Sequence, residues 1–377
     1  MKPLSEEFGP FNSRVWLNTA HQAPIPKNAV DALNEALRMK IEPWRIADDD
    51  FLEVPRRLKA GLARLLNASA DDIILGNSTS YGINLLAYGM RWQPGDEALL
   101  LAGDFPASVF PWLGQRNKGV SVRFVELKGS GFDADQLKSA LTSKTRVFCA
   151  SWVHSFTGEV MDLESVAEVC RDNGTWCVIN GSQGVGARAL DLSKSGISAI
   201  ASTGCKWLCG PYGTGFAWIH PRLRAKLEPI QTYWLPMMWS TGVSMRDYRM
   251  ANDLGAAAFD VFCTANFFNF MPWTAAVEYL CEQRVDAIEK HNDDLVEMLV
   301  KGLGKDFDLI SPAERENRSA IVVFSHREKS RNREICRVLY EDGIDIAVRE
   351  GNLRASPHLF NASDDIERLL RGLGGGT

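Results

Sequence analysis

Short apolar runs alternate with helical patterns through the first two thirds of the chain. The runs are strand-length, and turn signals such as Pro94-Gly95-Asp96 separate them from the neighbouring segments. Strand-type runs lie at residues 98–101, 120–125, 145–150 and 176–179, and a helical pattern lies at 163–173 before Gly174. A strand–helix rhythm of this kind predicts an α/β fold with a mostly parallel sheet wrapped by helices.

The pattern changes in the last third of the chain. A long helical stretch is expected at 275–303, with Val277, Leu280 and Cys281 at helical spacing. A strand at 319–324, a helix at 334–341 and a strand at 344–348 follow it in turn. The chain is therefore expected to divide into an N-terminal arm (1–15), a large domain (16–265) and a smaller C-terminal α+β domain (266–377), with part of the arm joining the smaller domain as an alternative.

Composition narrows the function classes. The chain has 377 residues, 45% of them hydrophobic, and a net charge of −5 without a basic stripe, so a nucleic-acid partner is not expected. No apolar run has the length of a membrane span, and the start lacks an apolar signal core, so a cytoplasmic protein is expected. The eight cysteines form no CxxC pair with matching histidines, so neither a metal site nor a disulfide framework is predicted.

One lysine lies in a setting suited to a particular cofactor. Lys206 stands within S-T-G-C-K-W-L-C-G-P-Y-G-T-G at 202–215. An imine-forming lysine, hydroxyls for a phosphate and glycines that let the backbone approach a flat ring fit pyridoxal 5'-phosphate. A surface lysine in a glycine-rich loop is the alternative. Against it, V-I-N-G-S-Q-G-V-G-A at 178–187 forms an apolar strand ending in polar residues, where open α/β sheets bind ligands.

Two further motifs extend the pattern to both ends of the chain. They are W-L-N-T-A at 16–20 and R-A-S-P-H-L-F-N at 354–361. With the segments above, they resemble the class V aminotransferase-fold enzymes, the pyridoxal-phosphate group that holds cysteine desulfurases, kynureninases and isopenicillin N epimerase-like proteins. The resemblance implies an aspartate-aminotransferase-like fold (fold type I), a homodimer, an amino-acid-like substrate and Lys206 as the imine lysine.

The resemblance also implies the phosphate ligands. Ser78 and Thr79, in G-N-S-T-S-Y-G-I-N at 76–84, match the phosphate-binding turn, where a helix start offers free N–H groups. An ordinary helix cap is the alternative. Thr203 matches a second phosphate ligand. Thr264 matches a Gly-Thr element that reaches the phosphate from the partner subunit, although Cys263 replaces the glycine here.

Other positions match the residues around the cofactor ring. Phe105 lies where desulfurases carry paired histidines, and it is expected to stack on the pyridine; core packing is the alternative. Gln183 matches the residue that hydrogen-bonds the phenolic oxygen. Asn180 departs from the family, which has an aspartate there that keeps the pyridine nitrogen protonated. The chain is thus an engineered variant, a natural enzyme that needs a weaker electron sink, or an attenuated or non-catalytic homologue, with the last ranked lowest.

Three residues are candidates for substrate binding. Arg354 matches the arginine that clamps the substrate α-carboxylate, with Arg349 as a nearby competitor. His21 borders the expected substrate pocket and is an acid–base candidate, with a loop hydrogen bond as the alternative. His154 is expected near the ring or the substrate.

The reaction type is narrowed by an absence in the sequence. Persulfide-forming desulfurases need a mobile cysteine shortly before the carboxylate arginine; residues 348–353 contain none, and Cys336 lies on a predicted helix. A lyase or related chemistry at Cα/Cβ is therefore expected, with Lys206 as the base at the α-carbon. An aminotransferase or epimerase of the same fold is the alternative.

Overall fold

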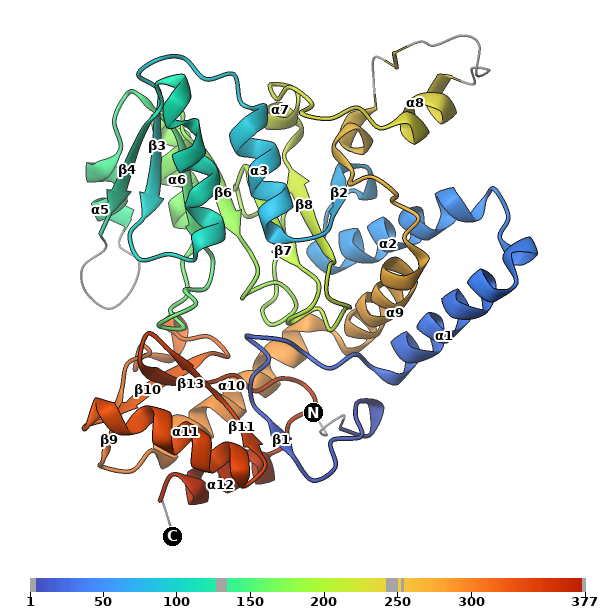
Figure 1. Cartoon of the computed structure of the whole chain (residues 1–377). Helices are drawn as coiled ribbons and strands as arrows, with labels where there is room; N and C mark the ends of the chain where they lie inside the picture. Colours follow the sequence, from blue (N-terminus) through green and yellow to red (C-terminus); the bar gives the residue numbers. More distant parts are fainter. Residues whose placement is uncertain (1–4, 127–133, 242–249, 252–253, 375–377) are drawn as a thin grey trace.

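The core of the molecule is a seven-stranded sheet in the order β2-β8-β7-β6-β5-β3-β4 (Figure 1). The computed structural model describes residues 5–126, 134–241, 250–251 and 254–374. The strands are β2 (Ile73–Gly76), β3 (Glu97–Leu101), β4 (Ser121–Val125), β5 (Thr145–Ser151), β6 (Trp176–Asn180), β7 (Ala199–Thr203) and β8 (Gly215–Ile219). Only β8 runs antiparallel to its neighbours, so the predicted mostly parallel sheet is confirmed.

Both faces of this sheet are covered, which explains why its strands read as nearly continuous apolar runs. Neighbouring residues of one strand point to opposite faces, so Phe148 and Ile179 join one core while Cys149 and Val178 join the other. The first core is covered by α1 (Lys27–Ile41), α2 (Asp50–Leu66), α6 (Leu163–Asn173) and α9 (Phe267–Gln283). The second is covered by α3 (Thr79–Gly89) and α4 (Phe110–Leu113), and shorter helices α5 (Ala134–Ala140), α7 (Pro221–Arg224) and α8 (Trp234–Thr241) lie in the connections.

The C-terminal part forms a smaller lobe beside the carboxyl edge of the sheet (Figure 1). A four-stranded antiparallel sheet has the order β12-β13-β10-β9, and a two-stranded parallel sheet pairs β1 with β11. These strands are β1 (Val15–Trp16), β9 (Phe307–Leu309), β10 (Val322–His326), β11 (Ile344–Asp345), β12 (Ala347–Arg349) and β13 (Asn352–Ala355). Three helices complete the lobe: α10 (Val285–Gly302), α11 (Asn332–Glu341) and α12 (Ser363–Gly372).

Three expectations for this lobe were wrong in detail. The helix expected over 275–303 is broken at Arg284, whose φ of +64° is incompatible with a continuing right-handed helix. The strand expected at 344–348 is two strands in two different sheets. The strand expected at 319–324 begins at Val322, because the Ser319 hydroxyl donates to the Gly158 carbonyl and ties the preceding residues to a loop.

The predicted domain boundaries stay a prediction, and the packing adds two facts to it. α9 packs on α1 and α2 with the first core, so it lies with the large sheet. Val15 and Leu17 belong to the core of the smaller lobe, because β1 pairs there with β11. None of the helices in the described residues has the length and apolar character needed to cross a membrane.

Candidate active site

Loops that follow the carboxyl ends of several strands meet at one edge of the large sheet. Ser78 follows β2, Gln183 follows β6 and Lys206 follows β7. Because these strands run in the same direction, the loops lie side by side, as in other open α/β sheets. Together with β12 and β13 of the smaller lobe they enclose a cavity of about 560 Å³. Its lining includes His21, Ser78, Thr79, Phe105, Ser182, Gln183, Thr203, Cys205, Lys206, Tyr212, Arg349 and Arg354.

The phosphate-type end of this cavity is the start of α3. Ser78 caps the helix, with its Oγ 3.2 Å from the Tyr81 nitrogen, and the Thr79 hydroxyl lies 2.5 Å from that of Ser182. Gly215 lets β8 approach closely, since an added Cβ there would stand 2.6 Å from the Ser78 nitrogen. Free N–H groups at a helix start, beside hydroxyls, form a site for an anion such as a phosphate.

Lys206 is the amine of the cavity. Removal from water, together with the positive charges of Arg354 and Arg349, lowers the pKa of Lys206 to about 8, partly opposed by Cys205. Its Nζ lies 5.4 Å from the centre of the Phe105 ring. An amine with a lowered pKa is more often neutral, which is the form that attacks a carbonyl.

Phe105 lines the cavity and is 37% exposed, which leaves its ring available for stacking against a flat ligand. Its loop is fastened by Asp104. The Asp104 carboxylate accepts from the Phe105 nitrogen at 2.6 Å, from the Ser151 nitrogen at 2.8 Å and from the Ser151 hydroxyl at 2.5 Å. These bonds tie the loop after β3 to the end of β5 and so fix the position of the Phe105 backbone that carries the ring.

Asn180 and Gln183 lie at the base of the site. Asn180 is buried, and its Oδ1 accepts from the nitrogen and the hydroxyl of Ser182, at 3.1 and 2.6 Å. Its Nδ2 donates to the Ser108 hydroxyl at 2.9 Å. The Gln183 amide donates to the Ala20 carbonyl at 3.0 Å and accepts from the Trp207 indole at 2.8 Å, which leaves one amide proton for another partner.

Two arginines and a histidine close the cavity from the other side. Arg354 is only 3% exposed; one of its terminal nitrogens donates to the Ser155 carbonyl at 3.3 Å, while its Nε has no hydrogen-bond partner in the described chain. Burial and the neighbouring Arg349 lower the pKa of Arg354 to about 10, so it stays charged at neutral pH. Burial and the nearby cations, Arg349 foremost, hold the pKa of His21 below its usual value, which favours the neutral imidazole.

Three predicted residues are not among those lining the cavity: Asn180, which is buried behind Ser182, His154 and Thr264. Both ring nitrogens of His154 face the chain itself, 3.0 Å from the Thr157 hydroxyl and 3.2 Å from the Gly103 carbonyl. Thr264 is buried just before α9 and does not line the cavity. The preceding Cys263 has a φ of +57°, so it keeps the backbone conformation that a glycine adopts readily.

Other residues at the site were not singled out from the sequence. Ser182 links Asn180 to Thr79, Ser108 holds the Asn180 amide, and Cys205 and Tyr212 line the cavity. Ser182, Cys205 and Tyr212 lie inside segments that were recognised as motifs, and Ser108 lies three residues after Phe105. Their position beside the matched residues was the signal available; their side-chain partners depend on contacts between strands.

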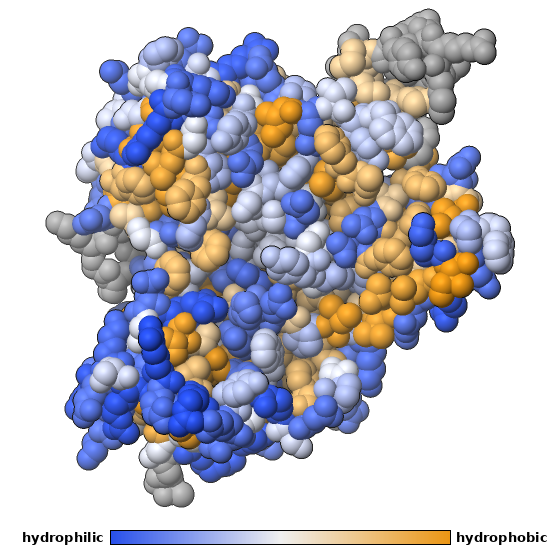
Figure 2. All heavy atoms as spheres, in the orientation of Figure 1, coloured by the Kyte–Doolittle hydropathy of each residue, from blue (hydrophilic) through white to orange (hydrophobic). Residues whose placement is uncertain are grey.

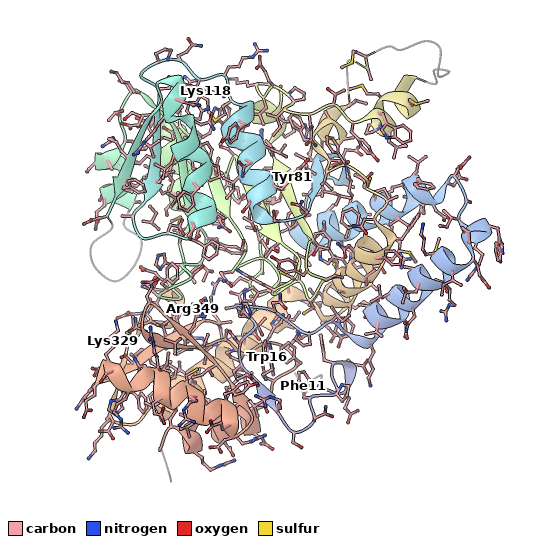
Figure 3. The ribbon with its side chains drawn as sticks, in the orientation of Figure 1. Phe11, Trp16, Tyr81, Lys118, Lys329 and Arg349 are labelled. Atoms are coloured by element: carbon pink, nitrogen blue, oxygen red, sulfur yellow. The ribbon has the colours of Figure 1, made fainter. Side chains whose placement is uncertain are left out.

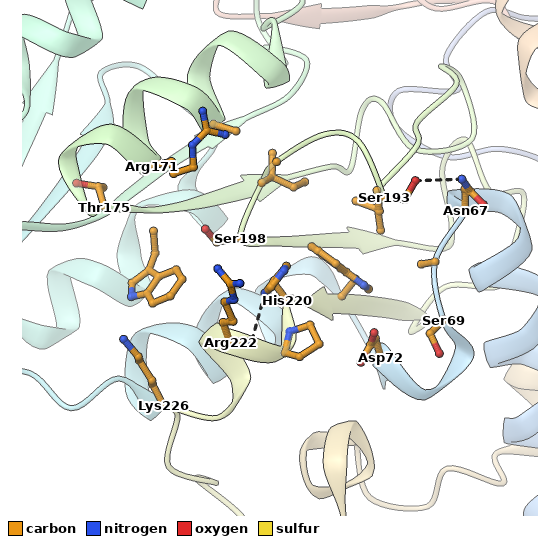
Figure 4. A pocket seen from close by; sticks show the side chains of 18 of the residues that line it. Asn67, Ser69, Asp72, Arg171, Thr175, Ser193, Ser198, His220, Arg222 and Lys226 are labelled. Carbon is orange, nitrogen blue, oxygen red and sulfur yellow. Dashed lines mark hydrogen bonds between the residues drawn. The ribbon is translucent and has the colours of Figure 1, made fainter.

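A second cavity, of about 780 Å³, lies at the opposite edge of the sheet, where β6 and β7 begin (Figure 4). Arg171, His220 and Arg222 contribute to its lining, and Lys226 lies with its Nζ 5.2 Å from the centre of the Trp176 ring. None of the residues expected to hold a cofactor or substrate lines it. The smaller cavity is therefore the candidate active site.

The comparison with family models identifies the group to which this site belongs. The model described as Aminotransferase class-V matches residues 15–369. The chain belongs to the class V aminotransferase family. This membership confirms the predicted family and the prediction of a pyridoxal-phosphate-dependent enzyme.

Relatives of this class V chain carry different activities in their names. A probable cysteine desulfurase of Methanothermobacter thermautotrophicus is 24% identical, over 95% of this chain and 94% of its own. The isopenicillin N epimerase of Streptomyces clavuligerus is 26% identical, over the same shares of the two chains. Both agree with the predicted chemistry on amino-acid substrates.

Solved structures confirm the fold of this class V chain. The cystine C–S lyase C-DES, in complex with its reaction product cysteine persulfide, matches with a TM-score of 0.89 and 21% identity, over 98% of this chain and 100% of its own. A C-DES mutant with glycine covalently linked to its pyridoxal-phosphate cofactor matches with a TM-score of 0.90 and 21% identity, over 100% of both chains. The predicted fold type I architecture is thereby confirmed.

Proposed function

We propose that the chain is a lyase that holds pyridoxal phosphate on Lys206 and acts at the Cα/Cβ bonds of an amino acid. The observation that carries the proposal is the Lys206 amine, with its pKa lowered to about 8, inside the cavity. At one end of the cavity a helix start suits a phosphate, and at the other end lies the buried Arg354, whose Nε has no hydrogen-bond partner in the described chain. Bound there, pyridoxal phosphate supplies a ring that stabilises negative charge at the substrate α-carbon.

The chain's own residues would divide the work of holding the cofactor. Ser78, Thr79 and Thr203 offer hydroxyls at the start of α3 and the end of β7, which suits a phosphate. The Phe105 ring covers the flat face, and the remaining amide proton of Gln183 is available to the phenolic oxygen. These assignments are consistent with the cavity lining, and they remain part of the proposal.

Arg354 and Lys206 would act on the substrate. The unpartnered Nε of Arg354 and its second terminal nitrogen suit a bidentate bond to the α-carboxylate, which would orient the α-carbon. The Lys206 amine, when it is not bound to the cofactor, would accept the proton from the substrate α-carbon. His21, whose pKa is held below its usual value by burial and the surrounding cations, is the second group able to accept or donate a proton in the cavity.

The cysteines favour a lyase over a persulfide-forming desulfurase. Among the described residues that line the cavity, Cys205 is the only cysteine, and it is buried beside the Thr203 hydroxyl. Cys336 is on α11, with its Sγ 3.6 Å from the Ile346 carbonyl. The described chain thus has no thiol at the substrate end to take up sulfur. The similarity to a cystine C–S lyase supports the same choice. An aminotransferase or epimerase remains the second candidate, supported by the epimerase relative.

Borohydride reduction of the cofactor-loaded protein, followed by peptide mapping, tests the attachment. We expect the reduced cofactor on Lys206, and a Lys206→Ala variant should carry none. A label on another lysine would contradict the proposal. Incubation with candidate amino acids and assay of released pyruvate and ammonia then separates a lyase, which releases both, from an aminotransferase, which needs an oxo-acid acceptor.

We also propose that the active unit is a homodimer. Apolar side chains gather on the side of the molecule formed by α1, α2 and the start of α9 (Figure 2). Trp44 is 80% exposed and Ile41 76%, and Phe51, Leu52 and Phe268 extend the same face. Exposed apolar surface of this kind suits an obligate interface with a second copy. The cytoplasmic location expected from the sequence stays a prediction.

A further inference from the structure

The substrate end of the active site holds more positive charge than one carboxylate needs. His21, Lys206, Arg349 and Arg354 line the cavity, and no aspartate or glutamate is among its described lining residues. Neither arginine forms an ion pair in the described chain; Arg349 donates only to the Val348 carbonyl and Arg354 only to that of Ser155. Two guanidinium groups held together without a counter-charge are unfavourable unless an anion joins them.

The pair is built into a tight hairpin. β12 and β13 pair with Arg349 opposite Asn352 and Ala347 opposite Arg354. The two arginines are therefore diagonal neighbours on one face, roughly 7–8 Å apart at their α-carbons. The turn between β12 and β13 has only two residues, Glu350 at φ +49° and Gly351 at φ +79°. Two positive φ values are typical of a type I′ turn, which fixes the register of the two strands.

The opposite face of the hairpin fixes where the arginines point. Leu353 is fully buried in the core of the smaller lobe, and Val348 packs against that core. Because side chains alternate along a strand, Arg349 and Arg354 face away from this core and into the cavity. Figure 3 shows Arg349 where the smaller lobe faces the central sheet.

The cofactor phosphate does not account for the second arginine. The hydroxyls that suit the phosphate come from α3 and the end of β7 on the large sheet, whereas the arginines come from the smaller lobe across the cavity. Position 180, which could have supplied a carboxylate at the base of the site, is an asparagine. After Arg354 takes the α-carboxylate, Arg349 and the neighbouring His21 still face the cavity without an anion.

We propose that the preferred substrate is an amino acid whose side chain carries a second anionic group, bound by Arg349 while Arg354 holds the α-carboxylate. This rests on the proposed function and specifies its substrate class. A guanidinium fork matches a carboxylate or another planar or tetrahedral oxyanion, and His21 offers a further hydrogen bond beside it.

Binding of two simple acids to the cofactor-loaded enzyme tests this without catalysis. Succinate has two carboxylates, butyrate has one, and the two chains are equal in length; neither has an amino group, so both bind without reacting. By calorimetry we expect succinate to bind at least about tenfold more tightly than butyrate. Arg349→Gln should reduce that preference to about twofold or less with butyrate binding little changed, while Arg354→Gln should weaken both acids.

A matched control lies beside the hairpin, in the short helical turn Lys329–Arg331 before α11. The Lys329 side chain packs against Gly351, with its Cε 2.9 Å from where a Cβ on that glycine would stand, but Lys329 does not line the cavity and lies farther out (Figure 3). Lys329→Gln removes the same charge nearby and should leave the succinate preference unchanged.

Three outcomes would overturn the inference. Equal affinities for succinate and butyrate, or an unchanged preference in Arg349→Gln, show that Arg349 does not bind a second anion. Equal weakening of both acids by Arg349→Gln shows that the two arginines share one carboxylate. These results leave the proposed function intact if borohydride still labels Lys206, so the two failures are distinguishable.

Discussion

At the residue scale, the Asn180 amide is held at both ends by the protein. Its oxygen accepts from Ser182 and its nitrogen donates to Ser108. An aspartate of the same shape can accept from both serines, since a hydroxyl rotates to donate. Asn180→Asp is therefore expected to fold and load cofactor normally, while adding a negative charge beneath the site.

That charge should change reactivity. A carboxylate at position 180 favours a protonated cofactor ring, which stabilises negative charge at the substrate α-carbon better. We expect Asn180→Asp to exchange the substrate α-proton with solvent deuterium at least about tenfold faster. NMR of a slowly turned-over amino acid measures the rate. Equal exchange in the two proteins would make position 180 an ordinary hydrogen-bonding residue at a strand end.

The lowered pKa of Lys206 predicts the pH dependence of cofactor uptake. With a pKa of about 8, roughly a tenth of the amine is neutral at pH 7, against well under a thousandth for an ordinary lysine. The rate of pyridoxal-phosphate attachment to the apoprotein should rise with pH and level off above about 8. Arg354→Gln removes the largest neighbouring charge and should move this midpoint upward; a midpoint near 10 in the unaltered protein would contradict the argument.

At the element scale, the sequence-based prediction of the site rested mainly on one rule: open α/β sheets bind ligands beyond the carboxyl ends of their parallel strands. Asn180 and Thr203 are terminal residues of neighbouring parallel strands, so their place at the same edge of the sheet follows from the sheet alone. The position of Arg349 beside Arg354 does not follow in this way, because it depends on the pairing of β12 with β13. Sequence periodicity merged β12 with β11, since both are short and adjoin each other, and so hid the hairpin.

The prediction of one continuous helix over 275–303 was wrong for a related reason. Apolar spacing continues on both sides of Arg284, and nothing in the side-chain pattern marks a residue with a positive φ. The break redirects the chain from the large sheet, where α9 packs, to the smaller lobe, where α10 packs. Apolar periodicity along the sequence detects both helices, but it does not show that α9 and α10 pack against different cores.

The turn of the arginine hairpin gives a stability prediction. Glu350 adopts a left-handed conformation, with φ +49°, which asparagine tolerates better than other side chains with a Cβ. Glu350→Asn should raise the free energy of unfolding by about 0.5–1 kcal/mol, measured by urea denaturation. Glu350→Gln is the control: it removes the charge without relieving the backbone. If the two variants have equal stability, backbone strain at this turn is not limiting.

At the scale of the whole molecule, the exposed apolar face and the active site adjoin each other. Tyr212 lines the cavity and is 79% exposed, and the neighbouring Gly213 carbonyl accepts from Asn269 in the first turn of α9 at 3.5 Å. Phe268 on that turn belongs to the apolar face, and Thr264 lies just before it. In the proposed homodimer, a two-fold interface on this face would bring each copy's Thr264 segment towards the partner's cavity.

The dimer should therefore be needed for stable cofactor binding as well as for solubility of this face. Sedimentation of the loaded protein should give a mass near twice the chain's 41.9 kDa. A double variant, Ile41→Glu with Trp44→Glu, places two charges on the most exposed apolar residues of α1 and the turn after it. It should sediment as a monomer and lose cofactor at least about tenfold faster on dilution, because a buried interface does not tolerate unpaired charges.

Val338→Glu is the matched control for that experiment, since Val338 is an exposed apolar residue on α11 of the smaller lobe, away from the apolar face. It should keep both the dimer mass and the rate of cofactor loss. A fully loaded monomer from the unaltered chain would disprove the dimer and the role of Thr264 together. A double variant that is monomeric but keeps its cofactor would support the interface on this face and contradict the role of Thr264 at the partner's phosphate. If Thr264 supplied a phosphate ligand to the partner, that ligand would be lost when the two copies separate.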